Sequence, residues 1–182
     1  MPEPQTLSAW LQQHVTTDPR ALQWFAHAGA EERIARAYKQ LLDGYKIDPA
    51  TVLKTTRTVS GLHYGHVTVR DINYYSLCAH HFLPFFGKAA ISYVPGDRIL
   101  GLGKLPRLLQ VFARRFQIQE DLCKDVAEAM MAHGHARGVL VTATGTHLCM
   151  CSRGPAEQQA VTETSYSLGT LQGITRHEDV RL

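Results

Sequence analysis

The apolar positions of the chain follow helical spacing in several segments. Between Glu31 and Tyr45, apolar residues recur every three or four positions, which predicts an amphipathic helix. The same spacing predicts two more helices, over Lys104–Phe116 and Gln119–Ala132. The segment from Ser8 to His27 has weaker helical signals, and Asp18-Pro19 interrupts them.

Other segments have the composition of strands and are bounded by turn residues such as Pro95-Gly96-Asp97. A turn around Gly61 and Gly65 is expected to join the first two of them. The pattern predicts an α+β chain with four main strands and with the helices grouped between strand pairs. The strand segments are Val52–Ser60, His66–Leu77, Phe85–Val94, Val139–Ser152 and Ala160–Leu168.

Length and composition limit the class of protein. A chain of 182 residues is most simply one domain, residues 1–182, with a helical N-terminal region, 1–50, and a core, 51–182. The mean hydropathy of -0.17 is ordinary for a soluble globular protein, and no stretch approaches the roughly 18 apolar residues that span a bilayer. The N-terminus, MPEPQTLSAW, has no secretory pattern. A net charge of +3 suits an anionic small molecule better than a long polyanion.

Cysteine and histidine are the residues most able to carry chemistry here. Without a secretory signal we expect a cytoplasmic, reducing location, where these two residue types together more often indicate metal binding or catalysis than disulfides. Cys123 lies in a helical pattern and is interpreted as a small core residue. The cysteines are Cys78, Cys123, Cys149 and Cys151.

The stretch SLCAHHFLPFFGK, residues 76–88, places Cys78, His80 and His81 in front of an apolar run. Three interpretations are open for this stretch: core filling, a structural zinc site, or half of a catalytic metal site. The stretch alone does not separate them.

A second stretch, THLCMCSRG, places His147, Cys149, Cys151 and Arg153 at every second position. In an extended strand these side chains share one face. Zinc accepts thiolate and imidazole ligands, and a catalytic zinc site uses three of them and leaves one position for water. A zinc ribbon that binds nucleic acid fits poorly, because it needs two short ligand pairs flanked by basic turns.

The two stretches together predict a metal site with three protein ligands. Cys78, His81 and one of Cys149 or Cys151 would form the ligand set. His80 and His147 would then remain available for proton transfer near neutral pH.

The chain resembles GTP cyclohydrolase I, the enzyme family that starts pterin and folate synthesis, over roughly Glu31 to Gly169. The C-E-H-H motif of that family is similar to Cys78-Ala79-His80-His81, which is followed by PFFGKAAISYVP. Further along, GLGKLPR resembles the motif G-L-S-K-x-x-R, and QIQE resembles Q-V-Q-E. The run from His147 to Gly154 resembles H-x-C-x-x-x-R-G, and TETSYSLG resembles the closing strand.

The resemblance implies a fold and an assembly. The fold is the tunnelling fold, or T-fold: a four-stranded antiparallel sheet with two helices packed on one face, here with additional N-terminal helices. Members of the family form toroidal homo-oligomers, usually decamers, with sites between subunits. Such an assembly would supply partners for the edges of an isolated sheet.

The resemblance also assigns roles to the residues expected around the guanine base of the nucleotide. It implies Cys78, His81 and Cys149 as zinc ligands, so that Cys151 is an extra thiol. It implies His80 and His147 as the proton-transfer residues for an attack of water, activated by zinc, on C8 of the purine. Gln119 and Glu120 fall on the guanine-binding positions, where a carboxylate accepts hydrogen bonds from N1–H and the 2-amino group.

The triphosphate is expected to meet basic residues. Arginine matches phosphate oxygens with two parallel hydrogen bonds, and a triphosphate carries enough charge to need several cations. ERIARAY resembles the R-V-A-K/R-x-Y motif of the family and adds two arginines on successive turns of one helix. The implied phosphate-binding residues are Arg33, Arg36, Lys104, Arg107 and Arg153.

Two positions depart from the family pattern. Ala79 replaces the glutamate of C-E-H-H, and Gly103 replaces the serine of G-L-S-K. The expected reaction is hydrolysis of GTP to formate and 7,8-dihydroneopterin triphosphate. The alternatives are a specialised member that stops at a ring-opened formamidopyrimidine or uses another purine nucleotide, and a zinc-stabilised nucleotide-binding protein without turnover.

Overall fold

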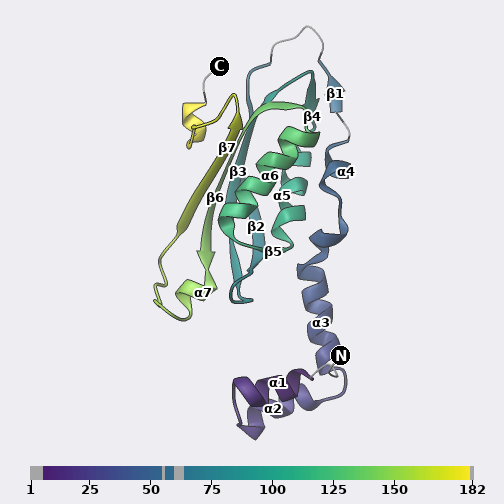
Figure 1. Cartoon of the computed structure of the whole chain (residues 1–182), viewed down its shortest axis with the longest axis vertical. Coiled ribbons are helices and arrows are strands. Elements are labelled where there is room, and N and C mark those ends of the chain that lie inside the picture. Colours follow the sequence, from purple (N-terminus) through teal and green to yellow (C-terminus); the bar gives the residue numbers. More distant parts are fainter. Residues whose placement is uncertain (1–5, 55, 60–63, 181–182) are drawn as a thin grey trace. The chain divides into compact units, whose positions relative to one another are not determined.

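The computed structural model describes residues 6–54, 56–59 and 64–180 (Figure 1). The chain forms two compact units, one reaching to Gln40 and the other beginning at Leu41. The predicted turn at Gly61 lies outside the described residues, so that prediction is untested.

The N-terminal unit consists of helices. α1 (Leu7–His14) is followed by α2 (Pro19–Ala26), whose start is fixed by Asp18: Oδ1 of this residue accepts a hydrogen bond from the Arg20 N–H at 2.8 Å. Pro19 occupies the first helical position, where its missing N–H costs nothing. α3 (Ala30–Leu41) follows. No helix in the described part of the chain is long and apolar enough to cross a membrane.

The predicted helix Glu31–Tyr45 ends earlier than expected, at Leu41, and a 3-10 turn, η1 (Asp43–Lys46), follows it. The reason lies at Gly44, whose N–H donates to the carbonyl oxygen of Arg114 at 3.1 Å. A Cβ atom at Gly44 would lie 2.2 Å from the carbonyl oxygen of Val111, so only glycine permits this approach.

The main sheet has the strand order β5-β2-β3-β6-β7 (Figure 1). The short β5 (Phe116–Gln117) pairs in parallel with the end of β2, so the helix predicted over Lys104–Phe116 stops before it. The long strands pair antiparallel with their neighbours. They are β2 (Val67–Cys78), β3 (Pro84–Pro95), β6 (Ala136–His147) and β7 (Thr162–Gly169).

Two helices, α5 (Lys104–Ala113) and α6 (Gln119–His133), pack on one face of this sheet (Figure 1). Their apolar stripes meet the sheet in one continuous core, in which Leu108, Val126 and Ile91 are fully buried. Removal of this apolar surface from water is the main stabilisation of the layer pair. The predicted α+β class and the T-fold arrangement, four antiparallel strands with two helices on one face, are confirmed.

The opposite face of the sheet carries both polar and apolar side chains and is partly covered by the C-terminal segment. Because strand side chains alternate, Ser92 and Thr142 point away from α5 and α6. On this side Leu171 and Val180 pack against sheet residues in a second, smaller core. η2 (His177–Asp179) belongs to the same segment.

The predicted strand Val52–Ser60 is wrong over its first part. Asp48 Oδ1 accepts a hydrogen bond from the Ala50 N–H at 2.9 Å, and Pro49 follows Asp48, so the chain begins a helix, α4 (Pro49–Leu53). The remainder is the short β1 (Thr56–Thr58), which pairs with β4 (Arg98–Leu100) in a separate two-stranded sheet.

Candidate functional site

Three strand ends meet at one end of the main sheet. Leu77 lies opposite Pro84 in the β2–β3 pairing, and Phe85 lies opposite His147 in the β3–β6 pairing. The parallel pairing of Cys78 with Gln117 brings the start of α6 to the same place. The register of the sheet therefore gathers residues that are far apart in the sequence.

The loop after β2 folds back on itself. The Cys78 N–H donates to the carbonyl oxygen of Leu83 at 2.8 Å, and Phe82 adopts a positive φ of 60°. This tight turn brings two imidazoles beside the thiol. Nδ1 of His81 lies 3.8 Å from Cys78 Sγ, and Nδ1 of His80 lies 4.0 Å from it.

The predicted strand Val139–Ser152 ends at His147, and the expected alternation of side chains beyond it is wrong. A helical turn, α7 (Leu148–Cys151), replaces the strand. Both the backbone N–H and the hydroxyl of Ser152 donate to the carbonyl oxygen of Leu148, at 2.9 and 2.6 Å, and close the turn. Cys149 and Cys151 therefore do not share the face of an extended strand.

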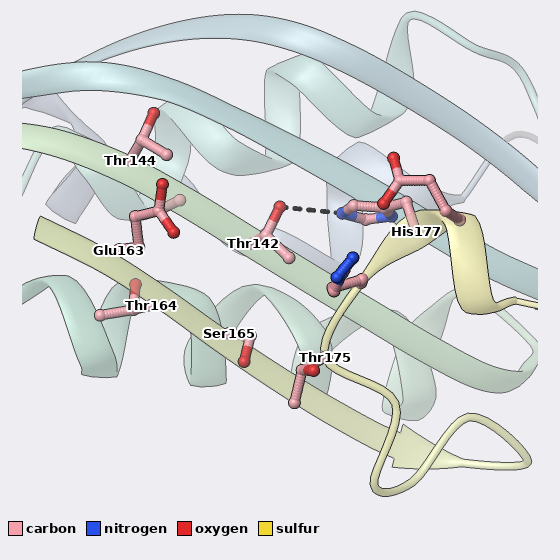
Figure 2. Close-up of a pocket in the computed structure, with 10 residues that line it drawn as sticks. Thr142, Thr144, Glu163, Thr164, Ser165, Thr175 and His177 are labelled. Atoms are coloured by element: carbon pink, nitrogen blue, oxygen red, sulfur yellow. Dashed lines mark hydrogen bonds between the residues drawn. The ribbon is translucent and has the colours of Figure 1, made fainter.

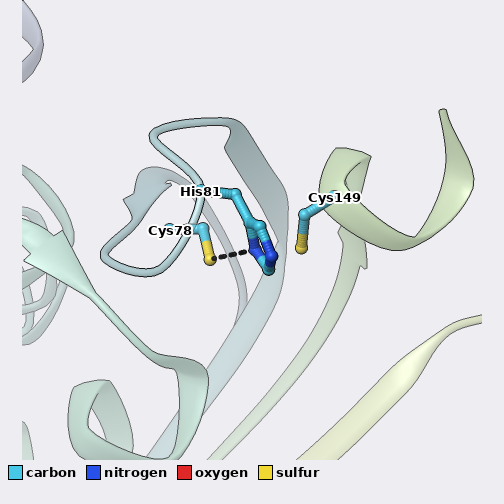
Figure 3. A group of neighbouring side chains, drawn as sticks. All are labelled: Cys78, His81 and Cys149. Atoms are coloured by element: carbon cyan, nitrogen blue, oxygen red, sulfur yellow. Dashed lines mark hydrogen bonds between the residues drawn. The ribbon is translucent and has the colours of Figure 1, made fainter. Parts of the chain in front are cut away.

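The helical turn places Cys149 opposite Cys78 and His81 (Figure 3). One ligand atom from each of these three residues lies within 4.8 Å of the others, so the group can hold a metal ion. Burial, followed by the neighbouring Cys78 thiol, raises the pKa of Cys149. A cation between the two sulfurs would stabilise both thiolates and so oppose this rise in the pKa. Cys151 is not part of this group.

A cavity of about 320 Å³ lies beside the Cys-His-Cys group. Its size is within the range of small-molecule sites, about 300–1,000 Å³. Its wall comes from the loop after β2, the start of α6, the end of β6 and α7. The lining residues are Cys78, His80, His81, Gln117, Ile118, Gln119, Glu120, His147, Cys149, Met150 and Thr162.

His147 is held from two directions. Its ring stacks on Phe85 with the centroids 4.5 Å apart and the planes 7° from parallel. In the ring plane, Nε2 lies 2.9 Å from Gln119 Oε1. Burial lowers the pKa of His147, and the charge of Glu120 acts in the opposite direction. Sequence reasoning missed Phe85, because its apolar run indicated only a core strand.

The predicted phosphate cations lie outside this cavity wall. Lys104 and Arg107 are on α5, where Arg107 lines a different, mainly apolar cavity. Arg153 follows α7, and its positive charge acts to lower the pKa of Cys149. Arg33 and Arg36 are exposed residues of α3 and belong to the N-terminal unit.

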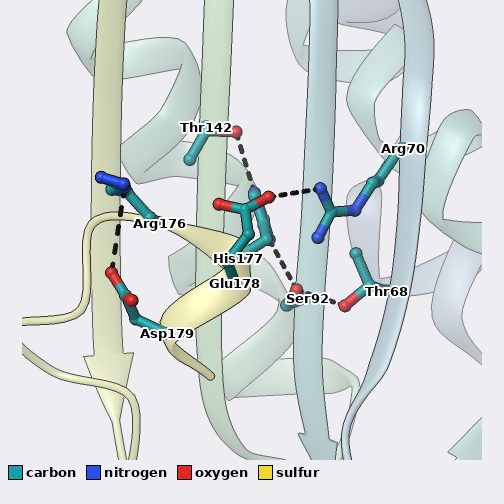
Figure 4. Close-up of polar contacts among 8 residues, drawn as sticks. All are labelled: Thr68, Arg70, Ser92, Thr142, Arg176, His177, Glu178 and Asp179. Carbon is teal, nitrogen blue, oxygen red and sulfur yellow. Dashed lines mark hydrogen bonds and ion pairs between the residues drawn. The ribbon is translucent and has the colours of Figure 1, made fainter. Parts of the chain in front are cut away.

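A larger cavity, of about 410 Å³, opens on the face of the sheet away from α5 and α6, beside the C-terminal segment (Figure 2). The buried imidazole of His177 lies at its edge, with Nδ1 2.6 Å from Ser92 Oγ and Nε2 2.8 Å from Thr142 Oγ1 (Figure 4). Thr68 in turn reaches Ser92 at 2.6 Å. Both ring nitrogens are engaged by hydroxyls of the sheet, so this cluster attaches the C-terminal segment and has no free group for chemistry.

Comparisons with known proteins found a matching family model and similar curated sequences. The model of the family described as GTP cyclohydrolase I matches residues 24–181. GTP cyclohydrolase 1 of Chlorobaculum tepidum is 45% identical over 154 residues, which cover 83% of this chain and 68% of that protein. GTP cyclohydrolase 1 of Campylobacter lari is 44% identical over 138 residues, which cover 76% of this chain and 72% of that protein.

Among solved structures, the chain is similar to an archaeosine synthase, QueF-Like, in the apo form, with a TM-score of 0.47 and 15% identity. The similarity covers 59% of this chain and 97% of that chain. A likeness at this level carries no functional argument.

The His177 cluster predicts a pH-dependent stability. Burial, followed by the charge of Arg70, lowers the pKa of His177, so the unfolded chain binds more protons than the folded one below the unfolded pKa of about 6.5. The free energy of unfolding should therefore fall as the pH decreases through that range. Unfolding midpoints measured at one protein concentration between about pH 7.5 and 5.5 should fall more steeply in the native protein than in His177→Gln. Equal pH dependence of the unfolding midpoint in the two proteins would contradict a lowered pKa of His177.

Proposed function

The chain belongs to the GTP cyclohydrolase I family and is a hydrolase of that type, and on this premise we propose that it converts GTP and water to formate and 7,8-dihydroneopterin triphosphate. This reaction is the first step of pterin and tetrahydrofolate synthesis. The observation that carries the proposal is the Cys78–His81–Cys149 group beside a cavity whose wall also holds His80, His147 and Glu120.

Zinc is the metal that suits this group. Two thiolates and one imidazole are ligands that zinc prefers, and three protein ligands leave a position open, as in catalytic zinc sites. Cys78, His81 and Cys149 would hold the ion at the edge of the cavity. When bound, zinc acts as a Lewis acid that makes water a nucleophile near neutral pH.

Two histidines of the cavity wall are suited to move protons. His80 is exposed beside Cys78, and His147 is half-buried with its pKa lowered by burial. A neutral imidazole near pH 7 can accept a proton and return it to a leaving nitrogen. We propose both as proton-transfer residues in the opening of the imidazole ring at C8.

Recognition of guanine is assigned to the first turn of α6. Glu120 is exposed and lines the cavity, so its carboxylate can accept hydrogen bonds from the N1–H and 2-amino groups of guanine. Adenine lacks this pair of donors. Gln119, the other predicted guanine residue, also lines the cavity but is only 1% exposed.

We propose that Lys104, Arg107, Arg153, Arg33 and Arg36 bind the triphosphate in an assembled homo-oligomer, a decamer as the family resemblance implies. The edges of the sheet support assembly. β7 has one strand partner, β6, and on the outer side of β2 the described residues provide only the two-residue β5. Such exposed edges are usually covered in stable proteins.

The departures at Ala79 and Gly103 favour one alternative, a specialised member that stops at the ring-opened formamidopyrimidine. Gly103 is the residue before α5, and it offers no side-chain hydrogen bond to the free N–H groups of that helix. A Cβ atom there would meet nothing within 4 Å. Ala79 is exposed. Both missing side chains can therefore be restored without steric conflict.

The metal assignment predicts about one zinc per chain. Zinc should be lost in Cys78→Ser and Cys149→Ser, because the hydroxyl of serine is a poor replacement for a thiolate ligand. Cys151→Ser is the matched control and should keep its zinc. Elemental analysis of the purified proteins checks this, and zinc that is retained in Cys149→Ser but lost in Cys151→Ser would reverse the assignment.

The reaction is tested by separating the products formed from GTP. We expect formate and a fluorescent pterin, with little ring-opened purine. Ala79→Glu combined with Gly103→Ser should raise the rate of pterin formation if these departures cost only efficiency. A ring-opened formamidopyrimidine without pterin would instead support the specialised enzyme. Tight nucleotide binding with full zinc and no turnover would support the binding protein.

Base recognition is tested at Glu120. Glu120→Gln presents an amide donor to part of the guanine edge, a mismatch that costs about 1–3 kcal/mol. The affinity for GTP should fall by about tenfold or more, with the zinc content unchanged. Asp121→Asn is the matched control, because Asp121 is the next residue, is exposed and does not line the cavity. Equal GTP binding by the native protein and Glu120→Gln would exclude Glu120 from the site.

A further inference from the structure

Gln119, the first residue of α6, is almost completely buried, with 1% of its surface exposed. Its side-chain nitrogen is surrounded by acceptors from two strands. Nε2 lies 3.0 Å from the carbonyl oxygen of Ala143, 3.1 Å from the carbonyl oxygen of Thr162 and 3.2 Å from Thr164 Oγ1. Both amide hydrogens of Gln119 are therefore taken by the protein itself.

These acceptors fix the orientation of the amide. A backbone carbonyl oxygen can only accept, so a flipped amide would place Oε1 against the carbonyl oxygens of Ala143 and Thr162. The nitrogen must face them. Oε1 consequently faces the two remaining neighbours, His147 Nε2 at 2.9 Å and the hydroxyl of Tyr74 at 3.3 Å.

The fixed amide also determines the state of His147. Because Oε1 is an acceptor only, His147 Nε2 must carry the hydrogen of this contact. In the neutral ring Nδ1 is then unprotonated, and it has no hydrogen-bond partner among the described residues. The stack on Phe85 fixes the plane of the ring while the contact with Gln119 fixes its rotation in that plane.

Gly145 provides the space for this arrangement. A Cβ atom at this position would lie 2.4 Å from Gln119 Oε1 and 2.6 Å from the Tyr74 hydroxyl. Real Cβ atoms essentially never make contacts this short, so any side chain at Gly145 must displace both groups. The absence of a side chain at Gly145 on β6 therefore leaves the room that the Gln119 side chain from α6 occupies.

We infer that Gln119 is a positioning residue: its amide, oriented by the carbonyl oxygens of Ala143 and Thr162, accepts the His147 Nε2–H and so sets the rotation of that ring beside the cavity. The inference rests on the proposed function, because it gives His147 its proton-transfer role. It replaces the guanine contact predicted for Gln119: an amide whose hydrogens are both engaged has none left for the base. Glu120 alone then recognises guanine from this turn of α6.

The test compares kinetics with a direct measurement of the tautomer. Gln119→Met keeps the length of the side chain and removes its donor and acceptor. We expect kcat to fall by about tenfold or more while KM for GTP stays within about twofold. Nitrogen-15 NMR of the zinc-loaded, histidine-labelled protein should show His147 protonated at Nε2 in the native chain, and a mixture of tautomers in Gln119→Met.

Two further variants keep the result interpretable. Gln117→Met removes the neighbouring buried glutamine, whose Nε2 donates to Asp125 at 3.0 Å, and should leave the Nε2–H tautomer of His147 intact. Gly145→Ala displaces Gln119 Oε1 without changing Gln119 itself, and should lower kcat and mix the tautomers in the same direction. If Gln119→Met fails to fold, the kcat and the His147 tautomer of Gly145→Ala test the inference instead.

A raised KM with unchanged kcat and an unchanged tautomer in Gln119→Met would overturn the inference and support the guanine contact. An Nδ1–H tautomer in the native protein would also overturn it. The NMR measurement needs no turnover, so it remains decisive if the native protein does not hydrolyse GTP. Absence of turnover together with the expected tautomer would count against the proposed function and support the positioning role.

Discussion

The pairing of β3 with both β2 and β6 is the constraint on which the rest of the site depends. Leu77 lies opposite Pro84, and Phe85 lies opposite His147, so the end of β2 and the end of β6 meet across two residues of β3. Strand side chains alternate between faces, and a slip of one residue would turn each of them to the opposite face. His147 would then leave the ring of Phe85, and the site would lose its fixed imidazole.

The two faces of the sheet use buried polar groups differently. On the outer face, His177 has both ring nitrogens engaged by Ser92 and Thr142, so its hydrogen bonds attach the C-terminal segment to the sheet. On the inner side, His147 has one nitrogen engaged by Gln119 and the other directed to no described partner. A fully satisfied histidine contributes to stability, whereas a half-satisfied one beside a cavity is available for proton transfer. His177 therefore offers no free ring nitrogen to the larger cavity.

Membership of the GTP cyclohydrolase I family gives the class of reaction, and the geometry indicates where this chain can differ from its relatives. Ala79 and Gly103 both lie at exposed positions, so a different side chain at either one need not disturb the core. Gln119 is buried, and in the Cys-His-Cys group Cys78 is buried while His81 is exposed. The expected consequence is a change in efficiency or product, with the framework of the site retained.

The sequence by itself determined the helices and long strands, because apolar periodicity and turn residues are local signals; Asp18-Pro19, for example, starts a helix as its chemistry requires. It also indicated a metal site, from Cys78 and His81 combined with the second stretch, His147 to Arg153. Spacing left Cys149 and Cys151 equal, and only the helical turn α7 after His147, closed by its hydrogen bonds, brings Cys149 to Cys78 and His81. The role of Gln119 was likewise decided by tertiary structure, since its partners include backbone carbonyls of Ala143 and Thr162. Every residue carries such a carbonyl, so no pattern of side chains can reveal which ones will face a buried amide.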